Sequence, residues 1–169
     1  MTASSSVEAW LGGPVPGIDP VLMPAAHALL QARRDLERAA RGATPAELWE
    51  RPGGAAAAGY HLRHLAGALD RLSTYARGER LTDAQRAALA AESNSGATAD
   101  ELITAAEETI DRVLEQLRRT PAASVFDART VGRAALPSNV LGLLFHAAEH
   151  TTRHVGQLIT TLRVVRGTP

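Results

Sequence analysis

Residues 145–157 read FHAAEHTTRHVGQ and contain three histidines, His146, His150 and His154, at intervals of four residues. In a helix, residues at this spacing lie on one face, about one turn apart. Apolar residues occupy the adjacent face and continue beyond both ends of the stretch: Leu141, Leu144, Ala148, Val155, Ile159 and Leu162. The pattern predicts a long amphipathic helix whose histidines border the core. Three imidazoles in line suggest a metal site.

The rest of the chain repeats the helical pattern. Apolar residues at helical spacing, bounded by capping residues and by Gly or Pro, predict long helices at about 20–41, 57–77, 98–119 and 137–166. Shorter helical segments are expected at about 44–50 and 82–92. Aromatic and β-branched residues are too sparse to indicate strands. The predicted fold class is all-α: a four-helix bundle with long crossover connections and two short extra helices.

Two segments are expected to lack regular structure. Residues 1–18 are rich in Ser, Gly and Pro and are predicted to form a flexible N-terminal arm, followed by one domain, 19–169. Residues 120–136 are predicted to be an irregular loop before the last helix. Large apolar side chains in these segments and in the short helix at 44–50 are expected to pack inward: Trp10, Trp49, Val125, Phe126 and Val131.

Composition excludes several classes of function. The chain has no cysteine, which excludes disulfides, thiolate metal ligands and a catalytic thiol, so a metal ion would need nitrogen or oxygen ligands. Its 18 basic and 18 acidic residues cancel and form no block of one sign, which argues against a nucleic-acid partner. No apolar run is long enough to span a membrane, and no signal peptide is recognisable at the N-terminus. A soluble, cytoplasmic protein is expected.

The helix predicted at 57–77 supplies two more imidazoles, His61 and His64. Facing helices of a bundle commonly build metal sites from inward side chains, so one of these histidines could complete a site with those of residues 145–157. Three neutral imidazoles with an open coordination position suit zinc, nickel, copper or iron(II) and leave room for water or substrate. The residues alone do not choose among the candidate ligands.

Two stretches resemble the DinB-like superfamily: residues 60–67, YHLRHLAG, and residues 150–157, HTTRHVGQ. Members commonly place one metal histidine before an apolar-small pair on the second helix. Two more, four residues apart, precede a Gly-Gln pair on the fourth helix. The resemblance implies that His64, His150 and His154 bind the metal. Many relatives have another histidine where this chain has Arg153, a departure that leaves the three ligands in place.

The resemblance covers about residues 20–166 and carries further expectations. It implies a four-helix bundle with long crossovers that forms a homodimer and binds a divalent transition metal, zinc or nickel being the most expected. Activities in the superfamily include thiol S-transfer, maleylpyruvate isomerisation and metal-dependent hydrolysis. A small-molecule substrate is therefore expected, with a low-molecular-weight thiol as a possible co-substrate, and family membership alone does not choose among these reactions.

Other polar residues near the expected site have two interpretations each. His146 could be a fourth ligand but is expected beside the ligands or at the mouth of the site. His61 could be a ligand but is expected to be a hydrogen-bonded core histidine. Gln157 could orient a ligand or a water molecule, or bond to a neighbouring helix. Arg71 and Tyr75 could hold a substrate carboxylate, but the sequence favours solvated surface positions for both.

Three hypotheses for function follow. The first is a metal-dependent transferase or hydrolase in which the open position of the ion activates water or an incoming thiol. The second is a non-catalytic metal-binding or stress-associated module whose ion stabilises the bundle or a dimer. The third is a member that binds a small ligand without metal. No residue of the sequence stands out as a general base, which keeps the second hypothesis open.

Overall fold

Four long helices form the body of the molecule in the computed structural model, which describes residues 7–167. These helices are α1 (Met23–Ala40), α3 (Ala58–Ala76), α5 (Ala99–Arg119) and α6 (Val140–Arg166). Two short helices lie in the connections, α2 (Pro45–Trp49) and α4 (Asp83–Ala90). Single turns of 3-10 helix occur at Ala9–Leu11, Pro20–Leu22, Pro52–Gly54 and Ala122–Ser124. The prediction of an all-α four-helix bundle with two short extra helices is confirmed.

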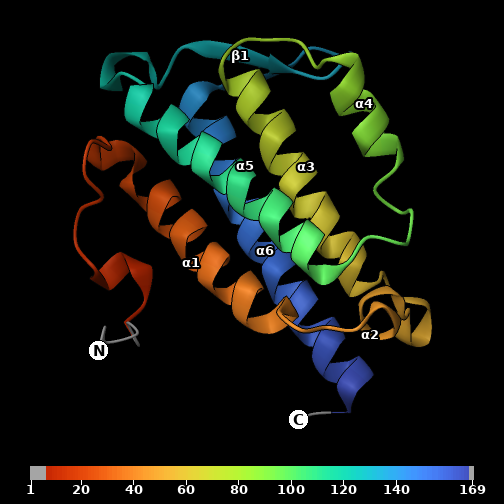
Figure 1. Cartoon of the computed structure of the whole chain (residues 1–169). Coiled ribbons are helices and arrows are strands. Elements are labelled where there is room, and N and C mark those ends of the chain that lie inside the picture. Colours follow the sequence, from red (N-terminus) through yellow and green to blue (C-terminus); the bar gives the residue numbers. More distant parts are fainter. Residues whose placement is uncertain (1–6, 168–169) are drawn as a thin grey trace.

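The helices are arranged so that α6 packs against both α3 and α1, while α5 packs against the other sides of the same two helices. Figure 1 shows that α1 and α6 run in one direction along the bundle and that α3 and α5 run in the other. Because α3 and α5 are parallel, the chain between them, residues 77–98, must return along the whole bundle, and α4 lies in this return path. This segment, called the crossover below, is a long connection of the predicted kind.

A β-hairpin precedes α6 and corrects one prediction. Strands β1 (Ala128–Val131) and β2 (Leu136–Asn139) pair antiparallel, within and just after the segment 120–136 that was predicted to be irregular. The strands have four residues each and one contains a proline, so their sequence signal is weak. The Asn139 side chain caps α6 by accepting a 2.6 Å hydrogen bond from the Gly142 backbone N–H. The helix therefore begins slightly later than expected.

The apolar side chains outside the long helices divide into two groups. Val125 is buried, and Trp49 and Val131 pack against the core, as predicted. Phe126 is 73% exposed and Trp10 is 61% exposed, so the prediction that they pack inward was wrong. In the turn before the hairpin Val125 takes the inward position, which leaves its neighbour Phe126 outside. The Trp10 indole donates a hydrogen bond to Glu8 at the surface.

The predicted N-terminal arm, residues 1–18, is described only from residue 7 onward. In this part, the backbone N–H of Ala9 donates a 3.0 Å hydrogen bond to the Gln31 side chain of α1. Ala9 itself is buried. The described part of the arm is thus in contact with the first long helix.

The core lies between the four long helices and is built mainly of leucine and alanine. Most of the leucines that are almost fully buried come from α1, α3 and α6. One more comes from α2, one from α5 and one from the 3-10 turn that precedes α1. Together they are Leu22, Leu29, Leu36, Leu48, Leu62, Leu65, Leu69, Leu117, Leu144, Leu158 and Leu162. Burying each of them contributes roughly 1.5–3 kcal/mol before entropy is counted. The apolar stripes that predicted the helices are therefore the surfaces by which they associate.

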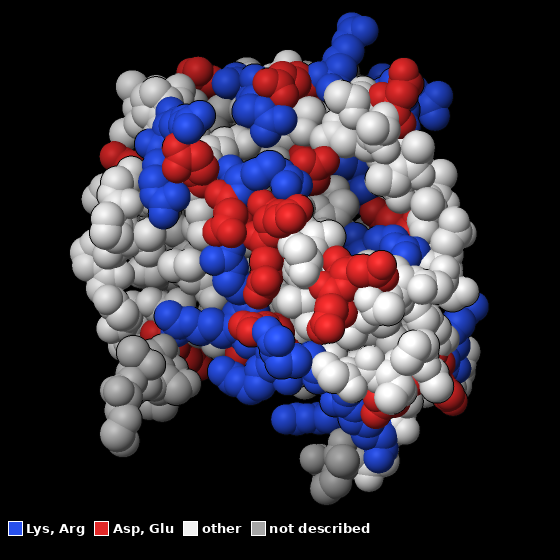
Figure 2. All heavy atoms as spheres, viewed as in Figure 1, with Lys and Arg blue, Asp and Glu red and all other residues white. Residues whose placement is uncertain are grey.

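The surface carries charges of both signs. On the face shown in Figure 2, arginines and acidic residues are interspersed, and neither forms a continuous field. This agrees with the net charge of zero. Among residues 7–167, no helix combines the length and apolar character that crossing a membrane requires.

Candidate metal centre

Three histidines from two neighbouring helices form a compact cluster. His64 comes from α3, and His150 and His154 come from α6. One ring nitrogen from each residue lies within 4.8 Å of one from the others, close enough for all three to hold one ion. The ring centroids of His64 and His154 are 4.5 Å apart, as are those of His150 and His154. These are the three histidines that the family resemblance implied as ligands.

The local sequence explains why the rings meet. On α6, the small or branched residues Ala147, Thr151 and Val155 are buried against the bundle, which places His150 and His154 at the edge of that buried face. Each is half-buried. Because α3 packs directly against α6, His64 at the edge of the α3 stripe faces the same side. Three rings are thus brought together by ordinary helix packing.

Glu92 holds His64 in place. One carboxylate oxygen of Glu92 lies 2.6 Å from Nδ1 of His64, and the other accepts a 2.7 Å hydrogen bond from Arg71. Glu92 is 5% exposed and Arg71 is 9% exposed. The prediction that Arg71 is a solvated surface residue was therefore wrong: its partner Glu92 compensates the charge that it buries. A carboxylate on the second nitrogen of a metal-binding histidine fixes the orientation and protonation of the ring.

A glycine makes room for this contact. A Cβ atom added at Gly67 would lie 2.7 Å from Arg71 Nη1 and 2.7 Å from Glu92 Oε1. Both distances are shorter than any normal contact, so a larger residue would displace the ion pair. Gly67 follows His64 by three residues on the same helix. Gly67 therefore allows the crossover to approach α3 closely.

His61 is a buried partner of His154. Its Nδ1 lies 3.1 Å from Nδ1 of His154, and its side chain is buried. This agrees with the prediction of a hydrogen-bonded core histidine. Tyr60, which precedes it in the sequence, stacks on the His64 ring at a centroid distance of 5.3 Å and an interplanar angle of 14°. Two of the three candidate ligands are therefore held from outside the cluster.

The environment of His61, His150 and His154 favours the neutral form of each ring. Burial lowers the pKa of His154 to about 4, with repulsion from His64 and His150 adding to the effect. Burial and the neighbouring His64 also lower the pKa of His61 and of His150. Burial opposes ionisation of Glu92, but its hydrogen bonds from His64 and Arg71 outweigh burial, so the pKa of Glu92 lies below its usual value. Neutral imidazoles beside an ionised carboxylate are the forms that bind a metal ion.

The donor set fits a divalent transition ion. Nδ1 of His150 is buried and has no hydrogen-bond partner among the described residues. A buried ring nitrogen without a partner costs about 1–3 kcal/mol, and coordination of an ion is one way to satisfy such an atom. Together with imidazole nitrogens from three histidines and no thiolate, this favours zinc, nickel, copper or iron(II) over magnesium or calcium.

The other candidate residues lie around the cluster in different ways. His146 is exposed, with its ring centroid 5.6 Å from that of His150 and its Nδ1 3.3 Å from Glu149. Gln157 is exposed on α6. Tyr75 is half-buried and packs against the core, so its predicted solvated position was also wrong. Glu149 forms a surface salt bridge with Arg153 on the same helix.

Sequence reasoning missed Glu92, the residue that binds His64. It lies 28 positions after His64, in a stretch that reads as the end of a short helix before a Ser-Asn-Ser-Gly turn. A lone glutamate at the end of such a helix normally points to solvent. The one feature of the sequence that pointed to this contact was Gly67, because a glycine inside a helix often marks a place where another segment packs closely against that helix.

The fold and the cluster together define a class: an all-helical bundle with a three-histidine candidate metal site between two of its long helices. A sequence model of the DinB superfamily matches residues 28–158, a range that includes all three histidines. The chain therefore belongs to the DinB superfamily, and the resemblance seen in its two histidine stretches is confirmed. Among curated proteins, no significant match was found.

Proposed function

We propose that this protein binds one divalent transition-metal ion, zinc or nickel, through His64, His150 and His154. The observation that carries the proposal is the approach of three ring nitrogens from α3 and α6 to within 4.8 Å of one another. Nδ1 of His64 and Nδ1 of His154 already face Glu92 and His61. Their Nε2 atoms are therefore the nitrogens left for an ion.

Three protein ligands leave at least one coordination position open, which supports catalysis over a purely structural role. We propose a metal-dependent transferase or hydrolase acting on a small molecule. A bound divalent ion supplies Lewis acidity and lowers the pKa of water or a thiol at the open position. The chain has no cysteine, so a reacting thiol would come from a low-molecular-weight co-substrate. The chain's own residues orient two of the ligand rings: Glu92 contacts His64 and His61 contacts His154.

Thermal denaturation with added ions tests the metal site. An ion that binds the folded state alone raises the melting temperature, and the rise grows with the logarithm of the free ion concentration once that exceeds the Kd. We expect zinc or nickel to raise it for the wild type and for His27→Ala, a control whose ring contacts the Gly13 carbonyl oxygen, away from the cluster. His154→Ala should show no such rise, and magnesium should have little effect on any of the three proteins. An equal zinc or nickel response in His154→Ala would refute the site.

Activity is tested separately, with ester, amide and thiol-acceptor substrates and with several low-molecular-weight thiols. The proposal predicts turnover by metal-loaded wild-type protein that is lost in chelator-treated protein and in His154→Ala. A metal-loaded protein that is inactive in every assay would instead favour the non-catalytic module, in which the ion stabilises the bundle.

We further propose that the protein is a cytoplasmic homodimer. The support for the dimer is a cavity of about 420 Å³ between α1 and α6, with Phe145 57% exposed at its wall. Apolar surface of this kind is common where subunits meet. Sedimentation analysis of the wild type and of Phe145→Ser tests the dimer: the wild type should sediment as a dimer and the variant should dissociate more readily.

A further inference from the structure

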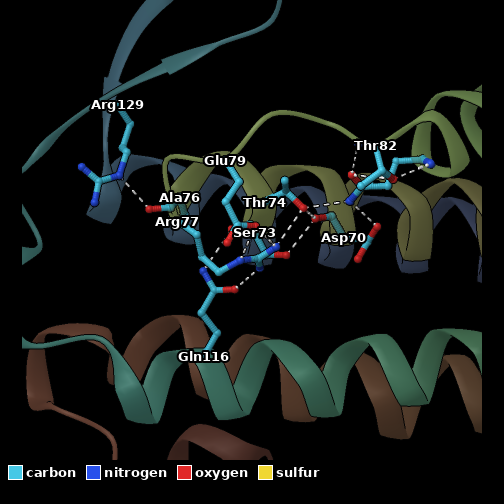
Figure 3. A network of polar contacts seen from close by, with 10 residues as sticks. Asp70, Ser73, Thr74, Ala76, Arg77, Glu79, Thr82, Gln116 and Arg129 are labelled. Atoms are coloured by element: carbon cyan, nitrogen blue, oxygen red, sulfur yellow. Dashed lines mark hydrogen bonds and ion pairs between the residues drawn. The ribbon is translucent and has the colours of Figure 1, made fainter.

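The crossover, residues 77–98, is attached to the bundle mainly by polar contacts. Helix α4, which forms its middle, has no buried residue. Gln85 near its start donates hydrogen bonds of 2.7 and 2.8 Å to Asp70 and Thr74 of α3. Figure 3 shows Thr82, the cap of α4, beside these two residues. An element with so little buried apolar surface has a low free energy of local opening.

The second attachment lies at the other end of α4 and reaches the candidate metal site. Glu92 is the only buried residue between positions 77 and 98, all of which the structure describes. Its carboxylate bridges His64 and Arg71, both on α3. Arg63 adds hydrogen bonds to the carbonyl oxygens of Ala91 and Asn94, on either side of Glu92. The crossover thus inserts one carboxylate into the bundle, and that carboxylate contacts a candidate metal ligand.

We propose that Glu92 is a positioning residue through which docking of the crossover and metal binding at His64 stabilise each other. The inference rests on the proposed metal site and adds a regulation of that site. When the crossover is docked, Glu92 accepts the Nδ1–H of His64, which leaves the Nε2 lone pair for an ion and fixes the ring. When the crossover lifts away, Glu92 becomes hydrated and His64 loses this partner.

The coupling acts in both directions. An ion bound at Nε2 withdraws electron density from the ring and makes Nδ1–H a stronger donor, so the bond to Glu92 becomes more favourable. By linkage, the factor by which docking increases metal affinity equals the factor by which metal increases docking. Loss of an outer partner of this kind typically weakens metal binding about 10- to 100-fold. Opening of the crossover should therefore become about 10- to 100-fold rarer when the ion is bound.

Hydrogen exchange followed by mass spectrometry tests the coupling in the full-length protein with and without zinc. In the wild type, zinc should slow exchange of the backbone amides of 83–95 by about 10-fold or more. In Glu92→Gln the zinc affinity, measured by competition with a chelator, should fall about 10-fold or more. The zinc-induced protection of 83–95 should shrink with it. The visible spectrum of the cobalt(II)-loaded variant should also change, because the orientation of His64 has changed.

Glu79→Gln is the matched control, because Glu79 lies in the same crossover and pairs with Arg77 at the far end from His64. The Glu79→Gln variant should bind zinc with the wild-type affinity, and zinc should slow exchange of its backbone amides 83–95 as much as in the wild type. Unchanged zinc affinity and protection in a folded Glu92→Gln protein would overturn the coupling while leaving the metal site intact. If that variant does not fold, the wild type decides: zinc that binds without slowing exchange in 83–95 would overturn it. Absence of zinc binding by the wild type would instead refute the metal site itself.

Discussion

Nδ1 of His61 and Nδ1 of His154 lie 3.1 Å apart, one on α3 and the other on α6. Two neutral imidazoles at this distance share one hydrogen, so one ring donates and the other accepts. Coordination of an ion through Nε2 of His154 requires the hydrogen of that ring to be on Nδ1, and His61 is placed to accept it. The geometry of the pair therefore accommodates the tautomer of His154 that binds metal through Nε2.

Replacing His61 should weaken metal binding without removing it. In His61→Phe the ring volume is kept but the acceptor for His154 is lost, so zinc affinity should fall about 10-fold or more. Chelator competition measures the change, and His27→Phe is the control because His27 lies outside the cluster. Equal zinc affinity in the wild type and His61→Phe would show that His61 only fills space.

The stability of the metal-free protein should depend on pH through the buried histidines. Burial lowers the pKa of His154 from 6.5 to about 4 in the folded protein. The unfolded chain therefore binds a proton at His154 below about pH 6.5, while the folded chain does so only near pH 4. The contribution of this pKa difference to the free energy of unfolding is fully present above pH 6.5 and is lost as the pH falls from 6.5 toward 4. The lowered pKa values of His61 and His150 add to the same trend.

Urea denaturation of metal-free protein at several pH values measures this dependence. His154→Asn removes one of the titrating groups, so its stability should fall less steeply between pH 7 and 5. A variant with the same slope as the wild type would show that His154 does not titrate as its burial predicts.

Two glycine substitutions should have opposite effects. Gly67→Ala places a Cβ atom 2.7 Å from both Arg71 and Glu92, so it should destabilise the protein by about 1–3 kcal/mol and weaken zinc binding. Gly156→Ala is the control on α6, because nothing lies within 4 Å of its added Cβ. It should stabilise the helix by about 0.5–1 kcal/mol. Thermal and urea denaturation give both values, and a neutral Gly67→Ala would contradict the close approach.

Removing Arg71 should destabilise the bundle because it leaves Glu92 with only His64 as a partner. Loss of one member of a buried ion pair costs about 3–5 kcal/mol, so Arg71→Met should lower the free energy of unfolding by about 3 kcal/mol. Arg86→Met, which breaks an exposed pair with Asp83 on α4, should change it little. Similar losses in the two variants would contradict a buried network.

Local sequence signals predicted most of the fold. Capping boxes at Thr44–Glu47 and Thr98–Glu101 begin two of the helices, and the stripes of leucine between such signals are the buried faces of the helices. The His150–His154 pair could be predicted for the same reason, since its members are neighbours on one helix. These features depend on interactions between residues that are close in sequence, and such interactions can be recognised from one amino-acid sequence.

The features that were missed depend on long-range contacts. Glu92 reaches His64 only because the crossover returns along the bundle, and no local pattern records that path. The hairpin formed by β1 and β2 depends on pairing between two four-residue strands with little periodicity. Phe126 and Val125 were equally apolar in sequence, and the turn decided which of them is buried.

The most direct test of the account is the metal content of the purified protein by elemental analysis after loading with zinc and dialysis. The wild type and His27→Ala should each retain about one ion per chain, while His64→Ala and His150→Ala should retain far less, because two imidazoles do not make a stable site. Circular dichroism confirms that the variants are folded. Equal metal content in all four proteins, or none in any, would contradict a metal centre at His64, His150 and His154.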